Sequence, residues 1–412
     1  VTKEVGFELR GMGCKKVMVL TDPHLASLRP QGPVQAVIDS LEEAKVPYEL
    51  FTEVQVEPTA TSFQKAIKFA EQGNFDSFVA VGGGSTMDTA KAANLYSTYP
   101  APFLTYVNAP IGQGQPPPGP LKPLIAIPTT AGTGSETTGV AIFDLDDIGA
   151  KTGIAHRLLR PVLGLIDPDN SKTMPKSVVA ASGFDVLSHS LESFTAIKYD
   201  QRSPRPLTPG QRPAYQGANP ISDVWSRAAL GIITKYFRRA YANVHDDDEA
   251  RAQMMLAATY AGTSLANSGV HLPHGMSYAI SGNVGDWRPN DWPDKLTSIV
   301  PHGYSVILSA PAVFRFTAAA NPDRHLEAAL LMGAPAKTSA ENAGQALSDA
   351  LIPLMKDLGV PNGLKAVGLK EADIPKLVQG TLPQHRVTKL APRQADQEAL
   401  ASLFREGLTL YQ

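Results

Sequence analysis

The hydrophobic pattern of this chain changes character near residue 173, and that change constrains the fold more than any other feature. Before it, short apolar runs rich in β-branched residues end in Gly, Pro, Asp or Thr and alternate with amphipathic segments. Such runs are typical of buried parallel strands. After it, helical patterns follow one another without strand signals. We therefore expect an α/β domain over residues 1–172 and an all-α domain over residues 173–412.

The expected elements can be given by their ranges. Strands are predicted at residues 15–22, 77–84, 123–130 and 161–168. Helices of period 3.6 are predicted in the first part at residues 33–46 and 61–73. In the second part, helices are predicted at residues 175–197, 219–243, 247–268, 304–333, 341–358 and 396–411. Two Pro- and Gly-rich insertions, at residues 198–220 and 281–301, are too long for ordinary connections.

Composition narrows the choice of partners. The 412 residues carry 37 Lys and Arg against 39 Asp and Glu, a net charge of −2, without long runs of one sign. This balance favours small molecules or other subunits, as in a homo-oligomer, over nucleic acid or an anionic membrane. The single cysteine, Cys14, fits a reducing compartment such as the cytosol or the mitochondrial matrix. The chain starts at Val1 rather than Met, so we expect a processed or incomplete start.

A glycine loop follows the second predicted strand. Gly82, Gly83 and Gly84 stand between an apolar run and a helical segment. Bare backbone N–H groups at a helix N-terminus suit a pyrophosphate, whereas the alternative is a simple tight turn. Ser85 and Asp88 form an S-x-x-D pattern that predicts a helix cap.

A second polar loop, residues 128–139, follows another predicted strand and offers several hydroxyl groups. These come from Thr129, Thr130, Thr133 and Ser135. Parallel strands end at one edge of the sheet, so both loops are expected there, together with Asp22 after the first strand. Asp22 is able to accept hydrogen bonds from a ribose diol and repel a 2′-phosphate. Its alternative role is that of an N-cap or turn residue before Pro23.

The second half carries an acid and several histidines in apolar surroundings. Asp185 and His189 are four residues apart, so a helix places them on one face. His271, His274 and His302 follow in later segments. Each alone is more often a satisfied core or surface histidine, but together they indicate a mixed oxygen and nitrogen site for one divalent ion. Spacing leaves open which of His271 and His274 faces the metal.

These motifs carry a resemblance to a known family. GGGSTMDTAK, PTTAGTGSE, LIDP, GFDVLSH, NPISD, HGMSY and PHG occur in this order over nearly the whole chain. They resemble the iron-containing (group III) alcohol dehydrogenase family, whose fold is shared with dehydroquinate synthase. Further stretches, GVAIFD, GVHLPHGMSYAISG and GTLPQHRVTKLAP among them, resemble a branch of that family found in the mitochondrial matrix.

The resemblance implies a set of ligands. It implies a divalent metal, usually ferrous iron with zinc as an alternative, held by Asp185, His189, His274 and His302. It leaves His271 unmatched. An acid at Asp22 is the family's pattern for NAD rather than NADP. The implied NAD contacts are Asp22, Gly83, Gly84, Ser85, Asp88, Thr129, Thr130 and Thr133, with Lys151 a weaker transfer.

The resemblance also implies an activity. In the mitochondrial branch that these stretches resemble, bound NAD carries hydride from 4-hydroxybutyrate to 2-oxoglutarate, giving succinate semialdehyde and 2-hydroxyglutarate. The metal favours loss of the hydroxyl proton and polarises a keto group. Three alternatives share parts of the same site. They are a conventional NAD-dependent alcohol dehydrogenase, a dehydroquinate-synthase-like lyase and a non-catalytic nucleotide-binding protein.

Two features depart from the family pattern or go beyond it. Many members have a second histidine four residues after the ligand, where this chain has Tyr278, a residue able to relay a proton or simply to pack. The opening strand segment usual in the family is largely missing here, in line with the expected processed or incomplete start. Because the acids carry carboxylates, we also expect a cation near the metal, from insertions that close over the cleft or from the C-terminal segment. The candidates, each of which is otherwise a solvated surface charge, are Arg202, Arg205, Arg212, Arg288, Lys295, Arg386 and Lys389.

Overall fold

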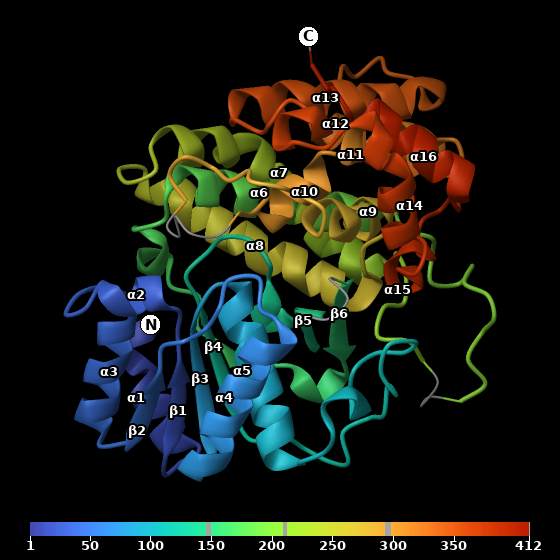
Figure 1. Cartoon of the computed structure of the whole chain (residues 1–412). Helices are drawn as coiled ribbons and strands as arrows, with labels where there is room; N and C mark the ends of the chain where they lie inside the picture. The colour runs from blue at the N-terminus through green and yellow to red at the C-terminus, as the bar shows by residue number, and fades with distance from the viewer. Residues whose placement is uncertain (146–149, 209–211, 293–297, 412) are drawn as a thin grey trace. The chain divides into compact units, whose positions relative to one another are not determined.

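The computed structural model describes residues 1–145, 150–208, 212–292 and 298–411. The chain forms two compact units, Val1–Thr173 and Met174–Gln412 (Figure 1). The first unit contains a parallel sheet with helices, and the second is built from helices in its described part. The predicted fold class, an α/β part followed by a helical part, is confirmed.

The first unit is organised by a five-stranded sheet in the order β2-β1-β3-β4-β7, and all its described pairings are parallel. The carboxyl ends of the strands therefore share one edge. The strands are β1 (Val17–Leu20), β2 (Tyr48–Phe51), β3 (Ser77–Gly82), β4 (Leu124–Pro128) and β7 (Leu163–Gly164). An antiparallel pair stands apart from this sheet, β5 (Val140–Leu145) with β6 (Ala150–Ala155).

Helices cover both faces of the sheet because successive strand residues point in opposite directions. Val17 and Val19 pack on one face with α1 (Val5–Gly11) and α3 (Gly32–Ala44). Met18 and Leu20 pack on the other face with α4 (Ala60–Gly73) and α5 (Gly84–Thr98). The short helix α2 (Pro23–Ser27) follows β1 in the chain. The two buried faces explain why the strand sequences are continuously apolar.

Several elements of the first unit differ from the predictions. The edge strand β2 was not predicted, because YELF has half-buried, exposed, half-buried and buried positions in turn instead of forming a buried apolar run. The β5–β6 pair and the first helix α1 were also missed. The last predicted strand, residues 161–168, shrinks to the two residues of β7. Edge strands pair on one side only, so their sequence signal is weak.

The second unit is arranged around α6 (Lys176–Thr195), a helix that is buried along most of its length. It packs against α7 (Pro220–Ala242), α8 (Asp248–Ser268) and α10 (His302–Ile307). The remaining helices are α9 (Leu272–Ser281), α11 (Ala310–Ala318), α12 (Pro322–Leu331), α13 (Ala343–Asp357), α14 (Ile374–Thr381), α15 (His385–Thr388) and α16 (Gln397–Glu406). A central helix enclosed by others has few exposed positions, which fits its near-continuous apolar and small residues.

Two helix predictions in this unit were wrong in extent. The segment 304–333 is not one helix but belongs to α10, α11 and α12, because Pro311 and Pro322 start new helices and cannot continue old ones. The last helix ends at Glu406 rather than at residue 411, with Gly407 after it. Within the described ranges, every helix is too short or too polar to cross a membrane.

Candidate functional site

Three histidines of the second unit converge on one carboxylate oxygen. The Oδ1 atom of Asp185 lies 3.3 Å from Nε2 of His189, 3.5 Å from Nε2 of His274 and 3.7 Å from Nε2 of His302. Asp185, His189 and His274 are buried and offer ligand atoms within 4.8 Å of one another. The structure thus brings together all four residues that the family resemblance implied as metal ligands.

Local sequence and close packing build this cluster. Asp185 and His189 lie one turn apart on α6, and His274 lies near the start of α9, behind Pro273. His302 begins α10, where Gly303 allows close contact with α6. A Cβ atom on Gly303 would lie 1.8 Å from the carbonyl oxygen of Ala181 and 2.9 Å from the backbone nitrogen of Asp185. Glycine is therefore required next to His302 for α10 to approach α6 this closely.

The cluster contains buried polar atoms that the protein leaves without partners. Asp185 Oδ1 and His274 Nε2 are buried and accept or donate no hydrogen bond in the described structure. Buried polar atoms in native proteins are nearly always satisfied, so such a pair requires an explanation. A divalent ion with ligands at about 2.0–2.2 Å in a tetrahedron would separate its ligand atoms by about 3.4 Å. The observed spacing and the donor set fit such an ion.

The charges of the cluster depend on one another. Burial raises the pKa of Asp185, but the neighbouring histidines outweigh it and hold that pKa well below its usual range. Burial lowers the pKa of His189 to about 4, so this ring is neutral and able to coordinate. His274 behaves differently, because Glu192 and Asp185 outweigh the effect of burial and raise its pKa to about 9. A cation bound at its Nε2 would take the place of that proton.

Glu192 is a residue of the cluster's surroundings that sequence reasoning missed. Its buried carboxylate accepts a hydrogen bond from Nδ1 of His274 at 2.6 Å and from the backbone N–H of His271 at 2.7 Å. The bond to Nδ1 turns Nε2 of His274 toward Asp185, as second partners of metal-binding histidines commonly do. A signal existed, because positions 185, 189 and 192 share one helical face.

His271 does not face the cluster. Its Nε2 lies 3.0 Å from Oγ1 of Thr195, and burial lowers its pKa to about 4. Of the two histidines that spacing left open, the structure therefore places His274 at the cluster and His271 away from it.

Tyr278, the residue in the place of the usual second histidine, borders the cluster. Its ring stacks on that of His302, with centroids 6.4 Å apart and planes 15° from parallel. Its hydroxyl accepts a hydrogen bond of 3.2 Å from Nη2 of Arg386 on α15. The structure thus joins one of the seven candidate cations to the surroundings of the cluster.

The other candidate cations are placed differently. Arg202 donates to the carbonyl oxygen of Tyr215, and Arg205 donates to that of Asp200 at 3.0 Å. These two arginines therefore brace the backbone of their own insertion. Arg212 and Lys389 are exposed, Arg288 is half-buried, and Lys295 lies outside the described residues.

In the first unit, the glycine loop and the threonine loop lie side by side. β3 and β4 pair up to Gly82 and Pro128, and the N–H of Thr129 donates to the carbonyl of Gly82 at 3.1 Å. A Cβ atom on Gly84 would lie 2.6 Å from Cγ2 of Thr133. On Gly83 it would lie 3.4 Å from Oγ1 of Thr130. The threonines thus cover bare glycine backbone, and a larger residue at Gly84 would not fit.

The same loop corrects one prediction. Ser85 and Asp88 do not form a helix cap, because α5 begins at Gly84 and has Gly83 as an N-cap without a side-chain bond. Ser85 Oγ instead accepts from the N–H of Glu57 at 3.2 Å. Asp88 accepts a hydrogen bond from Oγ of Ser135 at 2.6 Å, so its carboxylate has a partner within the first unit. The uncapped N–H groups of α5 remain able to bind an anion.

Asp22 and Lys151, two further residues implied for NAD, also have partners within the protein. Asp22 is the N-cap of α2, accepting from the N–H of Leu25 at 2.9 Å, and burial raises its pKa. The capping role considered from the sequence is thus present. Lys151 pairs with Glu57 at 2.6 Å and Asp144 at 3.1 Å. Burial lowers the pKa of Lys151, but these two carboxylates outweigh it and raise that pKa above its usual value.

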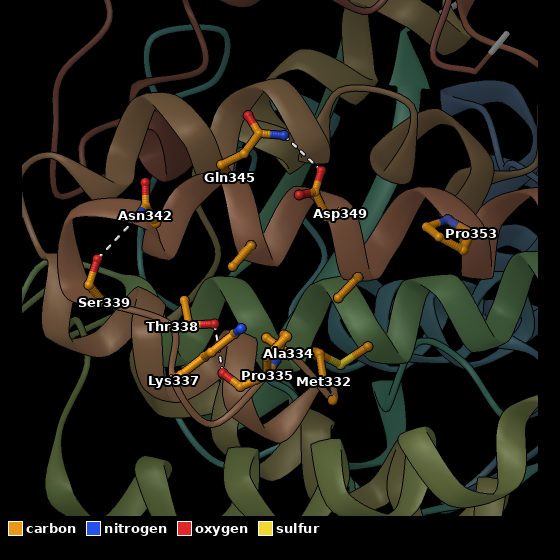
Figure 2. A pocket seen from close by; sticks show the side chains of 13 residues that line it. Met332, Ala334, Pro335, Lys337, Thr338, Ser339, Asn342, Gln345, Asp349 and Pro353 are labelled. Atoms are coloured by element: carbon orange, nitrogen blue, oxygen red, sulfur yellow. Dashed lines mark hydrogen bonds between the residues drawn. The ribbon is translucent and has the colours of Figure 1, made fainter.

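A surface pocket lies elsewhere in the second unit, between the end of α12 and α13 (Figure 2). It has a volume of about 590 Å³. Its polar side chains satisfy one another, since Gln345 donates to Asp349 at 2.7 Å and Thr338 donates to the carbonyl of Pro335 at 2.7 Å. The residues predicted as functional from the sequence are not among those that line it.

Comparison with known proteins shows the family. The model described as iron-containing alcohol dehydrogenase matches residues 1–168. A second model, described as Fe-containing alcohol dehydrogenase family, C-terminal, matches residues 214–408. The chain belongs to the iron-containing alcohol dehydrogenase family.

Curated relatives match over the full chain. The chain is 56% identical to the probable hydroxyacid-oxoacid transhydrogenase, mitochondrial, of Dictyostelium discoideum, a match that covers 100% of this chain and 77% of that protein. It is 55% identical to the hydroxyacid-oxoacid transhydrogenase, mitochondrial, of Bos taurus, with coverage of 100% and 88%.

Solved structures match as well. A 1,3-propanediol oxidoreductase superposes with a TM-score of 0.83 at 26% identity, covering 98% of this chain and 95% of that one. The sulfoacetaldehyde reductase of Bifidobacterium kashiwanohense, solved in complex with NAD+, gives a TM-score of 0.79 at 25% identity, covering 98% and 94%. These neighbours share the α/β and helical architecture of this chain.

Proposed function

We propose that the protein is a hydroxyacid-oxoacid transhydrogenase that moves hydride from 4-hydroxybutyrate to 2-oxoglutarate through bound NAD. The products are succinate semialdehyde and 2-hydroxyglutarate. The observation that carries the proposal is the convergence of three imidazole nitrogens on the unpartnered Oδ1 of buried Asp185. The full-length identity to relatives that bear this name supports the choice of substrates.

The metal centre consists of Asp185, His189, His274 and His302. The family description and the mixed oxygen and nitrogen donors favour ferrous iron, with zinc as the alternative. A divalent ion there supplies a positive charge that makes a substrate hydroxyl more acidic and polarises a keto group. Glu192 holds His274 in the tautomer that leaves Nε2 free for coordination.

Tyr278 is the residue proposed to exchange a proton with the substrate oxygen. Its hydroxyl accepts a hydrogen bond from Nη2 of Arg386, and a phenol hydroxyl is a donor as well as an acceptor. Its ring lies against His302, which directs the side chain along the edge of the cluster. The geometry is compatible with a general acid beside the reacting oxygen.

NAD is proposed to bind the first unit, residues 1–172, while residues 173–412 carry the metal and the substrate. Gly83, Gly84 and the start of α5 offer backbone N–H groups to the pyrophosphate. Asp22 lies after β1 at the same sheet edge, where a carboxylate selects NAD over NADP. The other proposed contacts are Ser85, Asp88, Thr129, Thr130, Thr133 and, with weaker support, Lys151.

The relatives and the composition support a proposal for the location and the partners of the protein. The curated relatives are named as mitochondrial, so we propose the mitochondrial matrix as the site of action. We also propose a homo-oligomer, which light scattering on the purified protein would test. The expected partners are hydroxy and oxo acids rather than nucleic acid, in line with the net charge of −2.

Isotope transfer tests the activity directly. The purified, iron-loaded protein is incubated with 2-oxoglutarate and 4-hydroxybutyrate deuterated at C4, without added NAD. We expect deuterated 2-hydroxyglutarate over many turnovers by mass spectrometry. Product that forms only when NAD is added, with NADH accumulating from an alcohol alone, would identify a conventional alcohol dehydrogenase instead.

A further inference from the structure

Arg386 is a part-buried cation whose described neighbours are aromatic rather than acidic. Its Nη2 donates to the hydroxyl of Tyr278 at 3.2 Å, and its guanidinium lies 5.6 Å from the ring centroid of Tyr215. Among the described residues, no carboxylate lies within 4 Å of it. Arg324, another part-buried arginine of this unit, is paired with Asp223. A guanidinium held away from water without an anion is costly unless a ligand supplies the charge.

The position of Arg386 is fixed by close packing of α15 on α9. Gly275 of α9 permits the contact, since a Cβ atom there would lie 2.6 Å from Cγ2 of Thr388. Thr388 is two residues from Arg386 on α15. The guanidinium therefore belongs to a rigid part of the unit rather than to a free surface side chain.

The ring of Tyr215 is fixed as well. Gln216 donates from its backbone to the carbonyl of Asn267 at 2.7 Å, and Gly217 donates to that of Ser268 at 2.9 Å. A Cβ atom on Gly269 would lie 2.6 Å from Cβ of Tyr215. The end of the first insertion is thus anchored between α8 and α9, with its aromatic ring against the guanidinium.

The arrangement connects Arg386 to the metal-binding cluster through one aromatic ring. Tyr278 bonds to Arg386 through its hydroxyl and stacks on His302 with its ring. His302 Nε2 in turn lies 3.7 Å from Asp185 Oδ1. Arg386 and the cluster thus contact the same tyrosine side chain, one through its hydroxyl and the other through its ring.

We propose that Arg386 binds the carboxylate of the acid substrate and thereby selects hydroxy and oxo acids over simple alcohols. The inference rests on the proposed function and names its specificity-determining residue. A guanidinium presents a planar fork of donors that matches a carboxylate, and Tyr278 and Tyr215 orient that fork. An alcohol without a carboxylate leaves the cation unpaired, which costs affinity.

The test compares an acid with an alcohol as hydride donor in the same iron-loaded protein, with 2-oxoglutarate as the hydride acceptor in both reactions. In Arg386→Gln, we expect the ratio of kcat/KM for 4-hydroxybutyrate to kcat/KM for 1-butanol to fall about 100-fold, mainly through KM. Arg386→Lys keeps the charge but not the fork, so the ratio should fall less. An unchanged ratio in Arg386→Gln would overturn the proposal, even if both activities fall.

Arg393→Gln is the matched control. Arg393 lies in the same C-terminal segment and donates to the carbonyl of Phe316 at 3.2 Å. Its guanidinium carbon lies 4.1 Å from the centroid of the Phe316 ring. Like Arg386, it donates a hydrogen bond and lies over an aromatic ring, but it is exposed and contacts another part of the unit. Its substitution should leave the ratio unchanged, and a fall equal to that in Arg386→Gln would contradict the assignment.

Direct binding separates this proposal from the proposed function. Calorimetry with 2-oxoglutarate, which needs no turnover, should give a dissociation constant about 100-fold weaker in Arg386→Gln than in the unmodified protein. If 2-oxoglutarate binds through Arg386 but no hydride exchange occurs, the carboxylate site stands and the transhydrogenase function fails. If exchange occurs and Arg386→Gln binds 2-oxoglutarate normally, the function stands and the carboxylate site fails.

Discussion

A buried charged group can be compared between the two units, Lys91 in the first and Asp185 in the second, because the protein surrounds them in opposite ways. In the first unit, Nζ of Lys91 is fully buried and lies 2.6 Å from Oγ and 2.8 Å from O of Ser135, with Val140, Thr138 and Asp88 completing its shell. In the second unit, Oδ1 of Asp185 faces three histidines without a hydrogen bond. Both charged groups are buried, but only Lys91 has hydrogen-bond partners from the protein for its charged atom.

The difference separates a structural charge from one that is prepared for a ligand. Burial lowers the pKa of Lys91, and Asp88 opposes that effect without outweighing it. Its oxygen shell ties α5 to the loop that carries Ser135, so Lys91 holds the two proposed NAD loops together. The Asp185 cluster has buried polar atoms without a partner, and in the proposed function a bound ion supplies that partner. We therefore expect substitution of Asp185 to change metal content and activity, and substitution of Lys91 to change stability.

The largest effect is expected for Asp185→Asn. Loss of the anionic ligand should remove the bound metal. Hydride transfer should then fall at least about 1,000-fold, because no ion is left beside the substrate oxygen. Metal content by mass spectrometry and activity are measured together. Asp169→Asn changes an exposed carboxylate and serves as the control. Full metal content in Asp185→Asn would contradict the assigned ligand.

Lys91→Met should affect stability instead. We expect the free energy of unfolding to fall by about 3 kcal/mol, because Asp88 and two carbonyl groups lose a buried partner. Urea denaturation measures the loss, and Lys65→Met, on the exposed side of α4, should stay within about 0.5 kcal/mol of the unmodified protein. Metal content should be unchanged, and loss of metal in Lys91→Met would break the distinction between the two places.

Glu192→Gln sharpens the comparison within the cluster. It preserves shape but removes the charge that holds Nδ1 of His274, so the metal dissociation constant should rise about 10- to 100-fold. A competition titration with a chelator measures this constant independently of activity. Glu398→Gln, at an exposed position of α16, should leave it unchanged. An unaltered constant in Glu192→Gln would make Glu192 merely structural.

The smallest effect concerns a histidine that the protein satisfies fully. His325 is buried, its ring nitrogens lie 2.8 Å from Thr317 Oγ1 and from the carbonyl of Asn321, and burial lowers its pKa from 6.5 to about 4. The unfolded chain therefore takes up a proton below pH 6.5 before the folded chain does. Stability contributed by neutral His325 is present at pH 7 and is lost as the pH falls toward 4.

His325→Gln tests this linkage. Between pH 7 and pH 5, the loss of unfolding free energy should be about 1–2 kcal/mol smaller in His325→Gln than in the unmodified protein. Urea denaturation at the two pH values measures it. Equal losses in both proteins would show that His325 is protonated in the folded state over this range.

The sequence by itself determined the features that depend on neighbouring residues. Continuous apolar runs and period-3.6 patterns predicted the division into an α/β part and a helical part, and the helical spacing placed Asp185 and His189 on one face. The order of the glycine and threonine loops after two apolar strands placed both at one sheet edge. These features are local because the backbone geometry of a helix or strand fixes them.

Only the tertiary structure decided which distant groups meet. Glu192 bonds to His274, Gly303 brings His302 to α6, and Arg386 reaches Tyr278 across 108 residues. The shell around Lys91 and the capping of α5 by Gly83 instead of Ser85 were likewise unreadable from spacing. Such contacts depend on how helices and strands pack, and many pairings of side chains are compatible with the same local pattern.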